Sequence, residues 1–216
     1  MRRISLHLNI HRTTVARKLK FLSTQARIEH PDSLRDFELK KSIHIQFDDL
    51  ETSEHTKCKP LSVCLAVDQK SRKILAFEVS LMPAKGHLAE ISRKKYGYRP
   101  DHRKIGLDGM FKKLKPFTNE STIFTSDEHP YYPKSLKKHF PNHTHIRVKS
   151  RRACIAGQGE LKKLIYDPLF SLNHTCAMLR ANMSRLIRRT WCTTKKRESL
   201  LDHLFIYAVF HNEVLT

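Results

Sequence analysis

The chain has 216 residues, with 41 lysines and arginines against 21 aspartates and glutamates, and a formal net charge of +20 at pH 7. This surplus indicates a polyanionic partner, for which nucleic acid is the usual candidate. No run of 18 apolar residues and no apolar leader is present, which argues against a membrane span and a signal peptide. The five cysteines are odd in number, widely spaced and without a C-x-x-C pair, so neither a disulfide framework nor a zinc ribbon is expected.

Residues 1–30 predict two short helices joined by a tight turn at Asn9 and Ile10. An apolar seam repeats at helical spacing through Ile4, Leu8, Val15, Leu19 and Leu22. The second helix opens with a basic and hydroxyl-rich segment of the kind that enters a DNA major groove, containing Arg12, Thr13, Thr14, Arg17 and Lys18. We interpret this region as a partial helix-turn-helix DNA-binding segment. An ordinary amphipathic helical hairpin is the alternative.

Residues 31–40 are polar and suit a linker or a short connecting helix, and residues 41–216 read as one α/β domain. Five strands are expected, at 43–48, 61–67, 74–79, 121–126 and 143–148. Helices are expected at 105–114 and 133–139, and the last third is helical. Asp167 and Pro168 are expected to begin a helix as N-cap and first-turn residue. Its buried stripe is Leu172, Cys176, Leu179, Met183 and Leu186.

Two of the expected strands end in an acid. Ile43, Ile45 and Phe47 alternate with polar residues up to Asp48, and the strand that starts at Ser121 leads to Asp127. If these strands are neighbours, two carboxylates a few Å apart would repel by about 4 kcal/mol at an effective dielectric near 20. A bound divalent cation removes that penalty. Taken singly, either acid is better explained as an ordinary turn residue.

The order of these elements, with acids on the first and fourth strands, resembles the ribonuclease-H-like fold, a mixed five-stranded sheet with flanking helices. Two segments also resemble bacterial insertion-sequence transposases of the DDE class. Ile45 to Leu50 (IQFDDL) is similar to the strand that carries the family's first acid. Leu186 to Cys192 (LIRRTWC) is similar to the basic end of its third catalytic helix. The resemblance covers about residues 1 to 212, and it implies a DNA transposase that cleaves strands and transfers them at insertion-sequence ends.

The resemblance also implies the site. Asp48 and Asp127 would be catalytic metal ligands, and Asn173 would stand where the family usually has a glutamate. Together they would hold two Mg²⁺ or Mn²⁺ ions. Arg180, Arg188 and Arg189 would contact DNA. Glu160 and Asp167 are alternative third ligands, followed by Glu51 and Asp49 as weaker ones.

The implied partners are double-stranded DNA, both transposon ends and target, and further copies of the chain as a homo-oligomer on DNA, with no membrane. The implied location is the bacterial cytoplasm, near the nucleoid. Two other readings remain. A catalytically decayed transposase would act only as a DNA-binding protein, and the asparagine favours it. Another nuclease of the same fold would share the acids but would not explain the helix-turn-helix.

Overall fold

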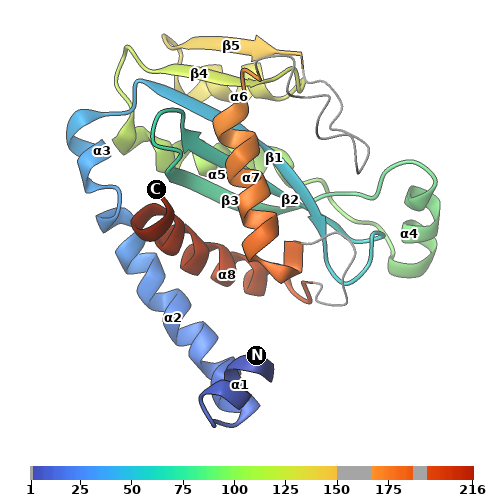
Figure 1. Cartoon of the computed structure of the whole chain (residues 1–216). Coiled ribbons are helices and arrows are strands. Elements are labelled where there is room, and N and C mark those ends of the chain that lie inside the picture. Colours follow the sequence, from blue (N-terminus) through green and yellow to red (C-terminus); the bar gives the residue numbers. More distant parts are fainter. Residues whose placement is uncertain (1, 150–166, 187–193) are drawn as a thin grey trace.

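The structure, a computed structural model, describes residues 2–149, 167–186 and 194–216. Its centre is a five-stranded sheet with strand order β3-β2-β1-β4-β5 and helices on both faces (Figure 1). This confirms the predicted α/β class with a mixed five-stranded sheet and flanking helices. Within the described part of the chain, no helix is both long enough and apolar enough to cross a membrane.

The first three strands form an antiparallel meander, and the last two continue the sheet in parallel. The strands are β1 (His44–Ser53), β2 (Pro60–Asp68), β3 (Ile74–Leu81), β4 (Ile123–Asp127) and β5 (Thr144–Val148). β1 pairs antiparallel with β2 and parallel with β4. β1 is therefore the strand at which the sheet changes direction, and its two neighbours come from distant parts of the sequence.

Strand β1 is longer than its alternating pattern predicts. The ladder with β2 continues from Ile45 opposite Asp68 to Ser53 opposite Pro60. Asp48 is thus an interior residue of β1, and the expectation that it ends the strand is wrong. The polar residues after Asp48 stay in the strand because β2 supplies backbone partners for them. Asp127, by contrast, is the last residue of β4, as predicted.

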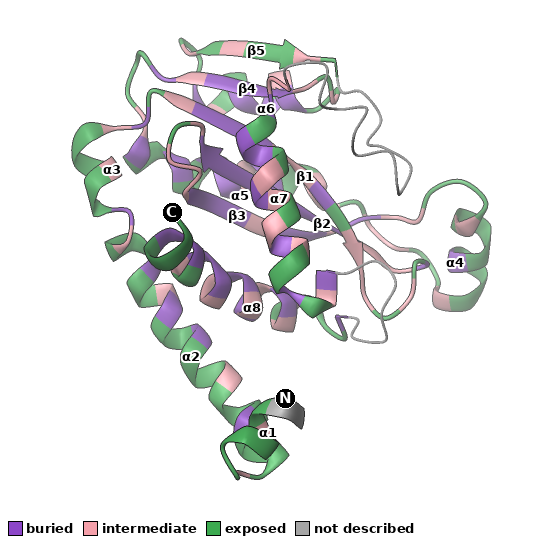
Figure 2. Cartoon of the chain, viewed as in Figure 1, coloured by how far each residue is buried: buried purple, intermediate pink, exposed green. Residues whose placement is uncertain are grey.

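The two faces of the sheet are covered by different helices (Figure 2). One face packs Ile45, Phe47 and Phe124 against α5 (Arg103–Leu114) and α6 (Tyr132–His139). The other packs β2 and β3 residues against α7 (Phe170–Asn182) and α8 (Arg197–Phe210). The alternation of side chains along β1 therefore sends even-numbered residues toward α7 and odd-numbered residues toward α5.

Further helical elements are α4 (Leu88–Tyr96), η1 (Lys115–Phe117), η3 (Ser184–Leu186) and η4 (His211–Leu215). Helix α7 begins at Phe170 with Leu169 as its N-cap, so the expectation that Asp167 is the N-cap is wrong. The Asp167 carboxylate instead accepts the backbone N–H of Leu169 at 3.0 Å. The predicted stripe is confirmed at Leu172, Leu179, Met183 and Leu186, which are buried.

Glycine at position 106 is explained by the close approach of α5 to the sheet. A Cβ atom there would lie 1.9 Å from Ser80 Oγ on β3. A glycine inside a helix normally costs about 1 kcal/mol relative to alanine. Here it allows α5 to pack directly on β3, which brings the N-terminal end of α5 to the edge of the sheet.

The N-terminal helices extend away from the sheet (Figure 1). They are α1 (Arg2–His7) and α2 (Arg12–Asp32), joined by a turn in which Asn9 has φ 48°. The turn lies where the sequence predicts it. The expected buried seam is wrong in most positions: Val15 is buried, but Ile4, Leu8 and Leu22 are 48%, 61% and 47% exposed. The two helices touch each other without enclosing a core of their own.

Helix α2 is longer than expected and crosses the proposed boundary at residue 30. Residues 31 and 32 complete α2, and α3 (Arg35–Lys40) fills most of the segment interpreted as a linker. The second half of α2 packs on α8 around the carboxylate of Asp202. That carboxylate accepts hydrogen bonds from Ser23 Oγ at 2.6 Å and Arg27 Nη2 at 3.0 Å, and Lys20 Nζ lies 3.5 Å away.

This contact predicts a stability effect for Asp202→Ala. Burial alone would raise the pKa of Asp202, but the hydrogen bonds from Ser23 and Arg27 outweigh it and hold the pKa below its usual value. A lowered carboxyl pKa stabilises the fold at neutral pH, and this contribution is lost as the pH falls through that lowered value. We expect Asp202→Ala to lower the free energy of unfolding by about 2 kcal/mol at neutral pH.

Urea unfolding at neutral and at strongly acidic pH measures this effect, with Glu213→Ala at an exposed position as the matched control. The loss should shrink toward acid. An Asp202→Ala protein as stable as the wild type at neutral pH would show that α2 is held to α8 by other contacts.

Candidate active site

The parallel pairing of β1 with β4 places Asp48 beside Asp127. The register runs through Ile45 opposite Phe124 and Gln46 opposite Thr125. Two residues further along both strands are Asp48 and Asp127, and residues two apart in a strand share a face. The electrostatic influence of Asp127 on the pKa of Asp48 agrees with this placement. Residues 79 positions apart in the numbering thus meet through one strand pair.

The two carboxylates are oriented by backbone amides. Asp48 Oδ1 accepts the Asp49 N–H at 2.7 Å and the Tyr132 hydroxyl at 2.9 Å. Asp127 Oδ1 accepts the His129 N–H at 2.9 Å. The hydrogen bonds of the described residues therefore use Oδ1 of each acid and leave the two Oδ2 atoms without a donor. This arrangement offers one oxygen from each carboxylate to a ligand.

Burial is the main cause of the unusual pKa of Asp48. Burial, together with the neighbouring charge of Asp127, raises the pKa of this carboxyl to about 7. The hydrogen bonds from Asp49 N–H and the Tyr132 hydroxyl act in the opposite direction but do not cancel the effect. A carboxyl group that titrates near neutrality in a buried site is a recognised signature of functional residues.

Tyr132 is the residue that supports this pair from α6. Its side chain is 1% exposed, and its ring packs edge-on against Phe47 with centroids 5.1 Å apart. Burial and the nearby carboxylates raise the pKa of its hydroxyl, so the group stays protonated and donates to Asp48. Tyr132 is therefore a positioning residue, which fixes the Asp48 carboxylate from the α6 side.

Asp49 is a third acid close to the pair, and it is half-buried. Burial raises its pKa to about 6, while the nearby Ser62 hydroxyl and the charge of Arg103 act in the opposite direction. As an odd-numbered residue of β1 it faces the α5 side of the sheet, away from α7. The Asp127 charge nevertheless acts on it, so three acids contribute negative potential to this end of β4.

Asn173 lies on the exposed side of the first turn of α7. Its Nδ2 donates to Asp167 Oδ2 at 2.8 Å, which ties together two of the residues considered as third ligands. The Asn173 amide oxygen takes no part in the hydrogen bonds among described residues, so it is available to a ligand. One turn later on α7, Asp48 and Arg180 both act on the thiol of Cys176, whose pKa burial raises to about 12.

The other residues predicted from the sequence are dispersed. The residues expected to contact DNA near the N-terminus are exposed on the first turns of α2, which is not part of the sheet that carries the acids. They are Arg12, Thr13, Thr14, Arg17 and Lys18. Glu51 Oε1 pairs with Lys85 Nζ at 2.5 Å. Glu160, Arg188 and Arg189 lie outside the described residues. Among the residues that the structure describes, no three His, Cys, Asp or Glu side chains gather as a metal-binding group.

Tyr132 and Gln46 are missed by sequence reasoning. Gln46 anchors α7 to the sheet: its Nε2 donates to the Pro168 carbonyl at 2.8 Å, and its Oε1 accepts the Leu172 N–H at 3.0 Å. The sequence could have indicated the role of Gln46, because a polar residue between Ile45 and Phe47 on a buried strand needs buried hydrogen-bond partners. Nothing in the sequence pairs Tyr132 with Asp48.

A scan against protein-family models finds no match for the chain, and a search of curated proteins finds none either. The geometry of the site therefore carries the functional argument.

The raised pKa of Asp48 predicts a pH-dependent stability. Because the folded protein keeps this proton up to about pH 7 while the unfolded chain releases it near 3.8, the folded state binds more protons between these values. The free energy of unfolding therefore falls as the pH rises through this window. Asp48→Asn removes the effect, and we expect it to raise the Tm in EDTA by about 4–8 °C near pH 8.

Thermal melts near pH 4 and pH 8 test this, with Glu51→Gln on the same strand as the control. The gain should be nearly absent at the acidic pH. An equal gain at both pH values would mean that ionisation of Asp48 is not its source.

Proposed function

We propose that this protein is a metal-dependent enzyme of phosphoryl transfer on DNA, a transposase of the DDE class with a ribonuclease-H-like catalytic domain. The observation that carries this proposal is the Asp48–Asp127 pair. Its two carboxylates sit on neighbouring parallel strands, each with one oxygen held by a backbone N–H and the other without a hydrogen-bond donor among the described residues. The strand order, with β1 between β2 and β4, is compatible with that fold.

The residues fit a hard divalent cation. Carboxylate and amide oxygens are the ligands that Mg²⁺ and Mn²⁺ prefer. Asp48 Oδ2, Asp127 Oδ2 and the amide oxygen of Asn173 would hold two such ions. A cation also explains why a buried carboxyl with a pKa near 7 is retained, because it offsets the repulsion between the acids. When bound, the ions would activate the attacking hydroxyl and stabilise the leaving oxygen.

The protein's own residues would orient the reaction. Tyr132 and the Asp49 N–H hold Oδ1 of the Asp48 carboxylate, which would leave Oδ2 to the metal ions. Arg180 lies one turn after Cys176 on the same face of α7, and it would position a phosphate oxygen. No nucleophile from the protein is required for this chemistry, because water or a DNA 3′-hydroxyl attacks the phosphorus.

The charge of the chain supports DNA as the substrate. A net charge of +20 suits the neutralisation of many phosphates, and binding should weaken steeply with salt. The exposed first turns of α2, with Arg12, Thr13 and Arg17, are where transposon-end recognition by a partial helix-turn-helix would lie. Homo-oligomerisation on DNA and a place in the bacterial cytoplasm near the nucleoid belong to the same proposal.

A second candidate is a decayed transposase that only binds DNA. Asn173 favours it, because an amide brings no charge to the site and its Nδ2 is already bonded to Asp167. The two candidates differ in a single property, which is the ability to break a phosphodiester bond.

We expect Mn²⁺- or Mg²⁺-dependent nicking of DNA that carries the terminal sequences of the element. Asp48→Ala and Asp127→Ala should each reduce the rate by at least about 10³-fold, because each removes a ligand of the ions that carry the chemistry. Glu51→Ala, on the same strand but paired with Lys85, should leave the rate within about twofold of the wild type. A wild-type protein that binds such DNA but nicks none under either metal would support the decayed form.

The third ligand is tested by Asn173→Glu. A carboxylate at this position would add negative charge to the ligand set, so we expect higher Mg²⁺-dependent activity. The new carboxylate would also repel Asp167, which now accepts from Asn173. The double variant Asp167→Asn, Asn173→Glu removes this repulsion and is the matched control. Lower activity in both variants would identify asparagine as the ligand that this site uses.

A further inference from the structure

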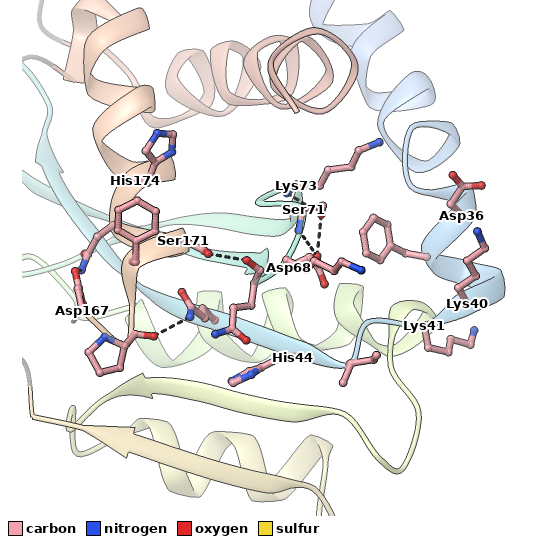
Figure 3. Close-up of a pocket in the computed structure, with 18 residues that line it drawn as sticks. Asp36, Lys40, Lys41, His44, Asp68, Ser71, Lys73, Asp167, Ser171 and His174 are labelled. Carbon is pink, nitrogen blue, oxygen red and sulfur yellow. Dashed lines mark hydrogen bonds between the residues drawn. The ribbon is translucent and has the colours of Figure 1, made fainter.

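A groove of about 1290 Å³ lies between α3 and α7. Its floor is the start of β1 with the β2–β3 turn, and its walls carry Phe37 from α3 and Phe170 from α7. Figure 3 shows Lys40 and Lys41 on the α3 side, Lys73 at the turn, and Asp167 and His174 on the α7 side. We call it the α3–α7 groove. It exceeds the usual size of a small-molecule pocket.

The floor of the groove is fixed by buried hydrogen bonds. Ser171 Oγ donates to the Gln69 carbonyl at 2.6 Å, which ties α7 to the β2–β3 turn. Asp68 accepts from Ser42 Oγ at 2.5 Å and from the Ser71 N–H at 2.7 Å. Gln46 holds the start of α7 through Pro168 and Leu172. The groove is therefore preformed, and a ligand would not have to order its floor.

The groove combines aromatic rings with ammonium groups. Phe170 is 56% exposed and Phe37 is half-buried, so both rings are accessible from the groove. Lys40 and Lys70 are exposed at its rim. Three acids also line the groove. Asp68 accepts from the serines, and Asp167 accepts from Leu169 N–H and Asn173. The third, Asp36 on α3, is exposed to solvent.

The groove is continuous with the face that carries the acids. Gln46 lines it and lies two residues before Asp48 on the same side of β1, which is about 7 Å along the strand. Asn173 lines it as well. A DNA strand with one phosphate at Asp48 and Asp127 would therefore have its next nucleotides at the mouth of the groove.

We propose that the α3–α7 groove binds unpaired nucleotides of the DNA strand beside the reacting phosphate, with a base stacked on Phe170 and the backbone phosphates at Lys40 and Lys70. Stacking on exposed aromatic rings combined with rim cations is the usual way in which proteins hold single strands without sequence preference. This inference rests on the proposed function for its substrate, but it makes a separate prediction about binding.

The test is the affinity for a short fluorescein-labelled oligothymidylate and for a hairpin duplex of matched length, measured by anisotropy in EDTA. Phe170→Ala should weaken single-strand binding by about 5- to 100-fold and duplex binding by less than about twofold. Lys40→Ala with Lys70→Ala should weaken single-strand binding and reduce its salt dependence. Phe170→Trp keeps a stacking surface and should retain wild-type affinity.

The control variants are Phe210→Ala, at a similarly exposed ring on α8, and Lys137→Ala on α6. Neither should change single-strand affinity. Wild-type affinity in Phe170→Ala, or an equal loss for single strand and duplex, would overturn the groove proposal.

Asp48→Ala separates this proposal from the proposed function. It should abolish nicking while leaving metal-free single-strand binding intact. Binding that depends on Phe170 in a protein that never nicks DNA would leave the groove standing and refute the enzyme. Nicking that depends on Asp48, with no role for Phe170 in binding, would do the reverse.

Discussion

The parallel pairing of β1 with β4 is the constraint on which the rest of the site depends. A single strand pair brings together two acids from distant parts of the chain, and it holds Asp48 where burial disfavours its charge. The fold cannot relieve this repulsion by moving one acid away, because each belongs to a central, hydrogen-bonded strand. The hydrogen bonds at the site fit this constraint, because Tyr132 and the amides of Asp49 and His129 hold Oδ1 of each acid.

The two faces of β1 near Asp48 make different contacts. On the α5 side, Phe47 packs against Phe111 and Tyr132, and the Tyr132 hydroxyl donates to Asp48. On the α7 side, Gln46 ties the start of the helix to the same strand. Position along β1 thus determines both the carboxylate pair and the neighbouring α3–α7 groove.

The sequence predicts the sheet well because alternation and apolar runs report burial directly. All five strands lie where expected, and the stripe from Leu172 to Leu186 is buried as its spacing indicates. The errors come from places where tertiary contacts override local patterns. β1 continues through Asp48 and Asp49 because β2 pairs with it, and α2 runs to Asp32 because α8 supports its second half. The meeting of Asp48 with Tyr132 depends on how α6 packs, which no local pattern encodes.

The length of α2 has a geometric consequence. Its 21 residues form a rod of about 30 Å, anchored near its C-terminal half by Asp202 and free of the sheet at its N-terminal end. Under the proposed function, the length of α2 would help to set the distance along the DNA between two points. One is the bases contacted by Arg12 and Thr13, and the other is the phosphate held by Asp48 and Asp127. Its span corresponds to about nine base pairs at 3.4 Å each. Insertion or removal of one helical turn in α2 would then move the point of cleavage along the DNA, with the chemistry itself unchanged.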